Sequence, residues 1–251
     1  MKTSTDDSMI RFEKVNKSFG AQAVLRDVSF EVAPGTAFCL LGRSGVGKSV
    51  TLKLLIGLLR PDSGAVVVDG ENVPELPRRQ LNRLRRKMGF LFQQAALFDS
   101  LSLGENVAFP LRRHKTSSES EMRGHIERVL DQVGLTGFYD KMPAELSGGM
   151  RKRAGLARAL AMEPAVLLID EPSAGLDPIT SAEIDELLLR QKREAKTTMV
   201  VVTHNIPSAR RIGDRLAILF EGSILAGGTV DELENSDSEF VQNFLHSTSG
   251  G

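Results

Sequence analysis

Hydrophobic and polar residues alternate loosely over residues 9–32, in the stretches MIRFEKV and AVLRDVSFEV. This period of two is typical of half-buried β-strands. A short apolar run at Thr36–Leu41 comes next and breaks into the glycine-rich GRSGVGKS. Apolar residues then recur at the i, i+3, i+4, i+7 spacing of one helix face, at Leu52, Leu55, Ile56 and Leu59. The pattern predicts strands, then a turn rich in glycine, then a helix.

The middle of the chain has a different pattern from its two ends. After RPDSG, which stops the first helix, AVVVDGENV predicts a strand, a turn at Asp69–Gly70 and a return strand. Charged, helical segments then prevail, with one apolar stripe at Ile126, Val129, Leu130 and Val133. Strand patterns return in AVLLID, TTMVVVTH and RLAILFEGSILAGG. We expect one α/β domain over residues 9–246, with a mostly helical insert at approximately 74–162 and disordered ends at 1–8 and 247–251.

The composition is that of a soluble globular protein, with 41% apolar and 25% charged residues among 251. The 32 Lys and Arg balance the 32 Asp and Glu, so the net charge gives no long-range attraction to nucleic acid. The longest apolar runs, AVLLI and LAILF, are too short to span a membrane, and MKTSTDDSMI contains no secretory signal. The single cysteine, Cys39, excludes an internal disulfide and is most simply a small buried hydrophobe. These features favour a cytoplasmic location.

The turn after the Thr36–Leu41 run carries the residues of a phosphate-binding loop. Its motif G-x-x-x-x-G-K-[ST] is filled, in order, by Gly42, Arg43, Ser44, Gly45, Val46, Gly47, Lys48 and Ser49. Glycines let successive backbone N–H groups turn inward, and the following helix adds positive potential towards a polyphosphate. Lys48 would reach the β- and γ-phosphates, and the Ser49 hydroxyl would bind Mg²⁺. A glycine-rich turn without this function would match the motif by chance in roughly 1% of chains of this length. We therefore expect a nucleotide site.

Two carboxylates follow the apolar run AVLLI. A parallel strand would deliver Asp170 beside the phosphate loop, where it would hold Mg²⁺ directly or through water. Glu171 would then face the γ-phosphate as the base that orients attacking water. Acidic residues after a strand also often cap the next helix or lie in solvent. The pair therefore indicates catalysis only because a complete phosphate loop lies upstream.

A phosphate loop alone fits a kinase, a GTPase, a helicase or a transporter motor. The segment LSGGM, at residues 146–150, precedes another helix, and Ser147, Gly148 and Gly149 form a second anion-binding helix start. One chain has no use for two such sites on the same γ-phosphate, unless a second copy supplies the other half. A metabolic kinase would leave LSGGM unexplained.

With these motifs the chain resembles the ATP-binding cassette family over nearly its full length. The resemblance implies an α/β fold of the P-loop NTPase type, with a mixed core sheet, flanking helices, a helical subdomain and an antiparallel β subdomain. It implies ATP and Mg²⁺ as ligands. It also implies a homodimer in which two cassettes meet head to tail and the LSGG of each closes the ATP site of the other.

The resemblance assigns roles to four further residues. Phe19 in KVNKSFG falls where an aromatic ring stacks on adenine, a position at which the family more often has tyrosine. Gln93 in GFLFQQAALF matches the glutamine that touches Mg²⁺ and water; Gln94 lies beside it, but the FQ spacing favours Gln93. Asp177 in SAGLD matches the loop that crosses the dimer seam, and His204 in VVVTHN matches the histidine that contacts the γ-phosphate. The remaining histidines match no family motif: His114, His125 and His246.

Within the family, LFQQAALFDSLSLGENVAFPLRRH and GLDPIT look most like ATPases of the mammalian-cell-entry lipid transport systems, which include the bacterial system that maintains outer-membrane lipid asymmetry. This resemblance implies a separate integral membrane permease, a lipid-binding subunit and a peripheral position on the inner face of the cell membrane. An importer ATPase for another small solute is an alternative. A cassette ATPase of DNA repair or translation is a further one, although such proteins usually carry paired cassettes or long insertions.

The basic run RRQLNRLRRK, residues 78–87, holds six cations and invites a nucleic-acid or lipid-headgroup interpretation. It has no interleaved aromatic residues, and the net charge of the chain is zero. A solvated helix face is the favoured interpretation. We therefore expect no nucleic-acid partner.

Overall fold

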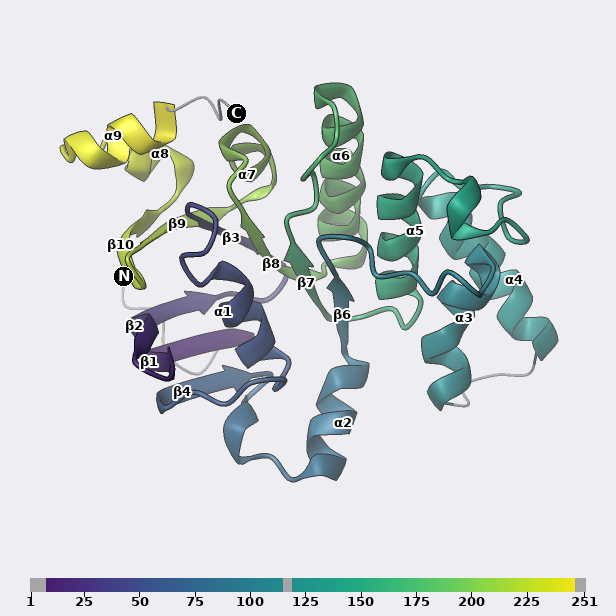
Figure 1. Cartoon of the computed structure of the whole chain (residues 1–251), viewed down its shortest axis with the longest axis horizontal. Coiled ribbons are helices and arrows are strands. Elements are labelled where there is room, and N and C mark those ends of the chain that lie inside the picture. Colours follow the sequence, from purple (N-terminus) through teal and green to yellow (C-terminus); the bar gives the residue numbers. More distant parts are fainter. Residues whose placement is uncertain (1–7, 115–118, 247–251) are drawn as a thin grey trace.

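The computed structural model describes residues 8–114 and 119–246. Residues 1–7 and 247–251, where disordered ends are expected, lie outside this part. The described chain forms a four-stranded sheet, a six-stranded sheet and helices around both (Figure 1). Within it, no helix combines the length and the apolar character needed to cross a membrane.

The four-stranded sheet has the strand order β2-β1-β4-β5 and is antiparallel throughout. Its strands are β1 (Ile10–Phe19), β2 (Gln22–Val32), β4 (Ser63–Val68) and β5 (Glu71–Asn72). Asp69 and Gly70 join β4 to β5, and their φ angles of 50° and 73° fit the type I′ turn of a two-residue hairpin. The predicted turn and the predicted antiparallel β subdomain are confirmed.

The six-stranded sheet has the order β10-β9-β3-β8-β7-β6. Its strands are β3 (Ala37–Leu41), β6 (Met88–Leu91), β7 (Val166–Asp170), β8 (Thr198–Thr203), β9 (Arg215–Phe220) and β10 (Ser223–Gly228). All pairs are parallel except β9 with β10, so the predicted mixed core sheet is confirmed. Every residue of β3, β7 and β8 is buried. Parallel strands that are covered on both faces need apolar residues throughout, which is why these segments show no alternation.

Helices cover both faces of this sheet. The helices of the described residues are α1 (Lys48–Leu55), α2 (Arg78–Arg86), α3 (Leu103–His114), α4 (Glu119–Gln132), α5 (Gly148–Leu160), α6 (Pro178–Ala195), α7 (Ile206–Ile212), α8 (Val230–Glu234) and α9 (Glu239–His246), with short 3-10 turns η1 (Val73–Glu75) and η2 (Pro143–Glu145). α1 packs between the two sheets, in contact with β4, β7 and β8. α7 packs against β3 and β8 from the other face, with α6 beside it.

The period of two along the buried strands divides the interior into two cores. Phe38 and Leu40 of β3 point into a core shared with α1 and the four-stranded sheet. Cys39 and Leu41 point into a second core shared with α6, α7 and the helical insert. β3 therefore has apolar neighbours on both sides, and its C-terminal end is held rigidly where the phosphate loop begins.

The first helix is shorter than predicted. It ends at Leu55, so Leu59 lies beyond it. Gly57 has a φ of 67°, a left-handed conformation that ends a helix. Arg85 of α2 donates hydrogen bonds to the carbonyl oxygens of Ile56 and Gly57, at 2.8 and 2.9 Å, and so satisfies acceptors that the end of the helix leaves free. The other arginines of α2 are exposed, as expected for a solvated helix face.

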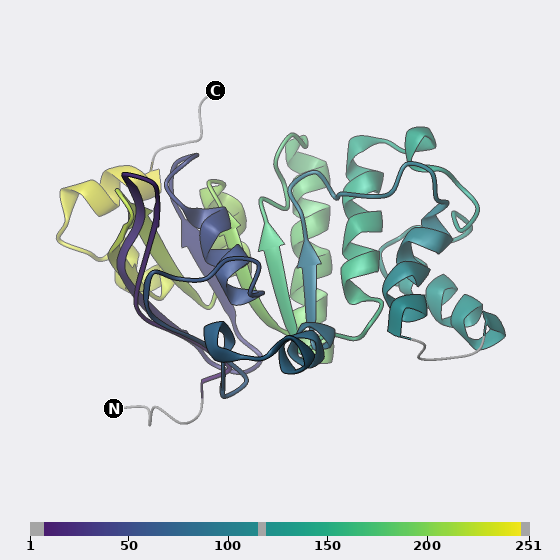
Figure 2. The same cartoon turned by 60° about the horizontal axis from the view of Figure 1, so that its bottom comes forward.

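The stretch 74–162 is not helical throughout. α3, α4 and α5 pack together, and the predicted stripe of α4 is buried between them. In both views α5 stands between α6 and the α3–α4 pair (Figures 1 and 2). β6, however, lies inside the stretch and pairs with β7 of the core sheet. Its run of four residues is too short for its periodicity to separate a strand from a buried helical turn.

Candidate active site

The phosphate loop connects β3 to α1, and its glycines are required by close contacts. Gly45 and Gly47 have φ angles of 82° and 112°. A Cβ atom on Gly47 would lie 2.9 Å from a methyl group of Leu25, and one on Gly42 would lie 2.7 Å from the carbonyl oxygen of Leu219. The loop can follow this path only without side chains at these positions. It leaves the N-terminus of α1, which begins at Lys48, open towards the pocket.

Lys48 is almost fully buried and folds back over the loop. Its Nζ donates hydrogen bonds to the carbonyl oxygens of Gly42 and Arg43, at 2.7 and 3.0 Å. The same Nζ lies 3.3 Å from Oε1 of Glu171. The ammonium group is therefore fixed between the loop and the acidic end of β7, where it can attract an anionic group that enters the pocket.

Asp170 and Ser49 approach each other from β7 and α1. The Ser49 hydroxyl donates to Oδ1 of Asp170 at 3.0 Å. Burial raises the pKa of the Asp170 carboxyl, and the hydrogen bond from Ser49 opposes this shift. A hydroxyl and a carboxylate side by side are hard oxygen ligands of the kind that Mg²⁺ prefers. Gln93 lines the same pocket, and its side-chain carbonyl is a third oxygen that could bind Mg²⁺ there.

Glu171 occupies a tight turn just after β7. Its φ of 48° is unusual for a residue with a side chain. Its Oε2 accepts hydrogen bonds from the Thr203 hydroxyl at 3.1 Å and from the backbone N–H of His204 at 3.2 Å. The Nδ1 atom of His204 lies 2.9 Å from the same oxygen. The turn therefore aims a buried carboxylate towards the end of β8, within reach of Lys48.

These side chains surround one pocket of about 370 Å³. Phe19 lies at its edge with 46% of its surface exposed, so its ring is available for stacking. Lys17 places its ammonium 5.5 Å from the centre of this ring. The predicted residues that line the pocket are Phe19, Ser44, Gly45, Gly47, Lys48, Ser49, Gln93, Glu171 and His204. Asp170 reaches the same place through its contact with Ser49.

Three predicted residues of the phosphate loop do not line the pocket themselves: Gly42, Arg43 and Val46. Four further predicted residues lie outside both the pocket lining and the loop: Ser147, Gly148, Gly149 and Asp177. Ser147 is exposed and caps α5, because its Oγ accepts from the N–H of Met150 at 3.3 Å. Asp177 caps α6 and accepts from the N–H groups of Ile179 and Thr180, both at 3.0 Å. α5 and α1 lie on opposite sides of β7 and β6 (Figures 1 and 2). The chain thus carries two separate helix starts, and only one is enclosed by its own residues.

Two residues at the site were not identified from the sequence. Thr203 directly precedes His204 and reads as the last residue of a strand. Lys152 is buried, and its ammonium contacts the backbone of both Gln93 and Glu171. In the sequence it lies between Arg151 and Arg153, and nothing distinguishes the buried cation from its two neighbours.

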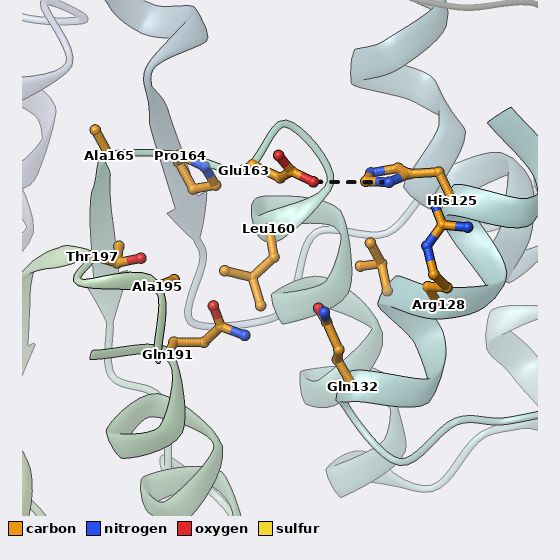
Figure 3. Close-up of a pocket in the computed structure, with 11 residues that line it drawn as sticks. His125, Arg128, Gln132, Leu160, Glu163, Pro164, Ala165, Gln191, Ala195 and Thr197 are labelled. Atoms are coloured by element: carbon orange, nitrogen blue, oxygen red, sulfur yellow. Dashed lines mark ion pairs between the residues drawn. The ribbon is translucent and has the colours of Figure 1, made fainter. Parts of the chain in front are cut away.

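A larger pocket, of about 530 Å³, lies between α4, α5 and α6, away from every predicted site residue (Figure 3). His125 lies at its edge, with Nε2 2.9 Å from the carbonyl oxygen of Ala161 and Nδ1 4.0 Å from Oε1 of Glu163. These contacts join α4 to the segment that follows α5. They give His125 a packing role, in keeping with its lack of a family motif.

A phosphate loop between a parallel strand and a helix, with an aspartate and a glutamate at the end of a second strand of the same sheet, defines a P-loop ATPase. The chain belongs to the ABC transporter family, whose model matches residues 25–174. It is the ATP-binding and ATP-hydrolysing cassette of such a transporter.

Similar proteins extend this assignment to nearly the whole chain. A probable ribonucleotide transport ATP-binding protein of Mycobacterium leprae, Mkl, is 43% identical over 94% of this chain and 68% of its own length. The intermembrane phospholipid transport system ATP-binding protein MlaF of Escherichia coli K12 is 36% identical over 97% of this chain and 91% of its own length. A solved ATP-binding cassette, dimeric and bound to ADP and Pi in a post-hydrolysis state, has a TM-score of 0.82 and 33% identity, covering 88% of this chain and 99% of that one.

Proposed function

We propose that the chain hydrolyses ATP to drive phospholipid transport between membranes through a separate permease. The observation that carries this proposal is the similarity to MlaF, which extends over 97% of the chain and almost all of that protein. The geometry supplies the ATPase half of the proposal. The support is that Lys48, Ser49 and Glu171 line one pocket and that Asp170 accepts a hydrogen bond from Ser49.

In this proposal the residues at the loop bind the nucleotide. Lys48 exchanges the carbonyl oxygens of Gly42 and Arg43 for the β- and γ-phosphates, and Phe19 stacks on the adenine. Ser49, Asp170 and Gln93 hold Mg²⁺, since they are the neutral and acidic oxygen donors gathered at the pocket. The bound ion would neutralise charge on the β- and γ-phosphates.

Glu171 is proposed to accept the proton of the attacking water. Its carboxylate is buried but already accepts three hydrogen bonds or close contacts from Thr203 and His204, so its orientation is set before a substrate binds. His204 retains 47% side-chain exposure and can turn its other ring nitrogen towards a γ-phosphate. Gln93 lines the same pocket and would orient the water.

A second copy of the chain is proposed to complete each ATP site. Ser147, Gly148 and Asp177 are exposed, and neither Ser147 nor Asp177 contacts the chain's own pocket. Ile179, beside Asp177, exposes 76% of its surface, a large apolar residue at the proposed seam. The similar solved cassette is dimeric. Together these features support a head-to-tail homodimer.

The permease is proposed to bind beside Gln93. A groove of about 340 Å³ there is lined by aromatic residues, among them Phe90, Phe92, Phe98 and Phe109. Phe92, Phe98 and Phe109 remain exposed by 39–47%, which is unusual for residues of this size. Docking here would hold the cassette peripherally on the cytoplasmic face of the cell membrane. A lipid-binding subunit would complete the system.

Glu171→Gln tests the proposal directly. The amide keeps the shape but cannot take the proton, so steady-state hydrolysis should fall by roughly 10²–10⁴-fold while ATP still binds. ATP should then trap a dimer, visible by light scattering. Glu163→Gln, a change at an exposed residue that follows α5 and lines the other pocket, is the control and should hydrolyse normally. Normal hydrolysis by Glu171→Gln would contradict the proposed roles.

A ribonucleotide cargo is the second candidate, because the Mkl relative carries that name at higher identity. The two cargoes separate in one experiment. The chain and its permease are reconstituted in vesicles, and ATP-dependent movement of labelled phospholipid and of labelled ribonucleotide is measured. Phospholipid movement that Glu171→Gln abolishes supports the first proposal, and ribonucleotide movement with the same dependence supports the second.

A further inference from the structure

Lys152 is a buried cation that the ATPase mechanism above does not use. It lies on α5, five residues after Ser147, and its surface is 5% exposed. Its Nζ donates to the carbonyl oxygen of Glu171 at 2.9 Å and, through a shorter contact, to the carbonyl oxygen of Gln93. Among the described residues it forms no ion pair with a carboxylate. Its two acceptors belong to the two segments that carry Gln93 and Glu171.

A buried lysine lowers the stability of the folded chain unless its charge forms favourable contacts. Burial lowers the pKa of Lys152, while the nearby carboxylates of Glu171 and Asp170 favour its charged form. Hydrogen bonds from an ammonium to carbonyl oxygens are roughly twice as strong as neutral ones. An apolar side chain of the same length would pack without that cost but would leave both carbonyl oxygens without this donor.

Lys152 is the side-chain donor to the backbone of the Glu171 turn. Its left-handed φ turns the Glu171 carbonyl away from the sheet and towards α5. On the other side, the backbone N–H of Glu171 donates to the carbonyl oxygen of Val202 at 2.9 Å. The backbone N–H of Ala174 also donates to the Glu171 carbonyl oxygen, at 3.3 Å. The backbone of the turn is therefore held by β8, by Ala174 and by Lys152, and its carboxylate is held by the contacts described above.

The Gln93 segment is attached to the same helix twice. Lys152 contacts the Gln93 carbonyl. Arg158, six residues further along α5, donates to the carbonyl oxygens of Ala95 and Ala96 at 2.7 and 2.6 Å. Both alanines have positive φ angles, of 60° and 49°. A displacement of α5 would therefore move the Gln93 segment as well as the Glu171 turn.

We infer that Lys152 is a positioning residue, which ties the Gln93 segment and the Glu171 turn to the helix that begins at Ser147. It lies about 7.5 Å along the helix axis from Ser147, the residue that caps α5. A movement of α5 when Ser147 binds an anion therefore moves Lys152 as well. Contact of the LSGGM helix with the partner's ATP therefore shifts the position of the Glu171 carboxylate in the same chain. The inference rests on the proposed function, since it assumes the roles given to Ser147 and Glu171.

The test compares Lys152→Met with Lys152→Arg in the purified full-length chain. Methionine keeps the length but cannot donate, and a misplacement of about 1 Å can cost on the order of 10²-fold in rate. We expect kcat to fall roughly 10–10²-fold while KM and ATP affinity of the monomer stay within about twofold. Lys152→Arg should restore part of the rate. Lys192→Met is the control. Lys192 donates to the backbone carbonyl of Ile212 and pairs with Asp214, both away from the pocket, so this variant should leave kcat unchanged.

A double variant separates positioning from stability. If Lys152 acts through Glu171, Lys152→Met should change the residual rate of the Glu171→Gln chain by less than about twofold, because the group it positions no longer accepts a proton. If the rate losses of the two single variants multiply in the double variant, the inference is wrong. It is also wrong if Lys152→Met has a normal kcat while Glu171→Gln is inactive. Normal hydrolysis by Glu171→Gln alone would instead contradict the proposed function. If Lys152→Met does not fold, Lys152→Gln carries the same comparisons.

Discussion

The two glycine-containing helix starts of this chain, at α1 and at α5, differ in what surrounds them. The start of α1 faces a pocket with a buried ammonium, a hydroxyl, two carboxylates and a histidine, all from the same chain. The start of α5 is exposed, and the hydroxyl of Ser147 caps its own helix. Both offer backbone N–H groups to an anion, yet only the first has the side chains that chemistry needs.

This difference fits the proposal that each catalytic site is divided between two copies of the protein. The α1 half is closed, so it can bind ATP alone. In the proposed homodimer, the α5 half would contribute only hydrogen-bond donors, to the ATP that the partner chain holds. The comparison therefore predicts that changes at α1 abolish both binding and hydrolysis, whereas changes at α5 abolish hydrolysis alone.

Lys48→Ala should have the largest effect, because it removes the charge of the closed half. Binding of ATP by the monomer should weaken severely, and hydrolysis should fall by at least the roughly 10²–10³-fold typical of losing one preorganised charged donor. Isothermal titration and steady-state turnover measure the two quantities. Lys53→Ala, an exposed lysine on the same helix, is the control and should leave both unchanged. Near-normal turnover by Lys48→Ala would contradict the proposed difference between the N-terminus of α1 and that of α5.

Ser147→Arg should separate the two measurements. A bulky cation at the exposed start would block closure of the dimer, while the loop from Gly42 to Ser49 would be untouched. Hydrolysis and ATP-dependent dimerisation should be lost, and monomer affinity for ATP should stay near that of the unmodified chain. Thr229→Arg also removes a helix cap, that of α8, and should leave hydrolysis intact. Loss of monomer ATP binding in Ser147→Arg would mean that LSGGM serves its own chain's nucleotide.

A smaller effect should appear in the pH dependence of stability. The ionised carboxylate of Asp170 should lower the stability of the folded chain, and that of Asp177 should raise it. Burial raises the pKa of the Asp170 carboxyl, so the folded chain holds that proton more tightly than the unfolded chain does. The ordinary pKa of an aspartate carboxyl is 3.8. As the pH rises above this value, ionisation of Asp170 therefore lowers the stability of the folded chain. Hydrogen bonds from Thr180 lower the pKa of Asp177, so its contribution is present above 3.8 and is lost as pH falls through the lowered value.

Thermal unfolding without nucleotide or Mg²⁺ measures this difference. Asp170→Asn should raise the midpoint relative to the unmodified chain, and the gain should grow from pH 4 towards pH 7. Asp177→Asn should lower the midpoint at neutral pH, and its loss should shrink on acidification. Equal signs for the two variants would mean that the closed and exposed regions do not differ in desolvation.

Much of the fold could be predicted, since most elements depend on local patterns. The continuous apolar runs of β7 and β8 and the turn at Asp69–Gly70 need only a period and a turn signal. β6 was missed because four apolar residues carry no period, and its assignment depends on pairing with β7, far along the chain. The end of α1 was misplaced because Gly57 stops the helix while the apolar spacing continues.

The sequence alone determined which residues could bind a nucleotide, because the phosphate loop, the carboxylates after β7 and the LSGGM segment are each written within a few consecutive positions. Only the tertiary structure decided which of them meet. It joined Ser49 to Asp170 and Glu171 to His204, and it left Ser147 on the surface. It also separated Lys152 from the arginines on either side, because which face of a helix is buried depends on the strands and loops packed against it. Local chemistry follows from neighbours in the chain, whereas a shared site follows from contacts between residues far apart in it.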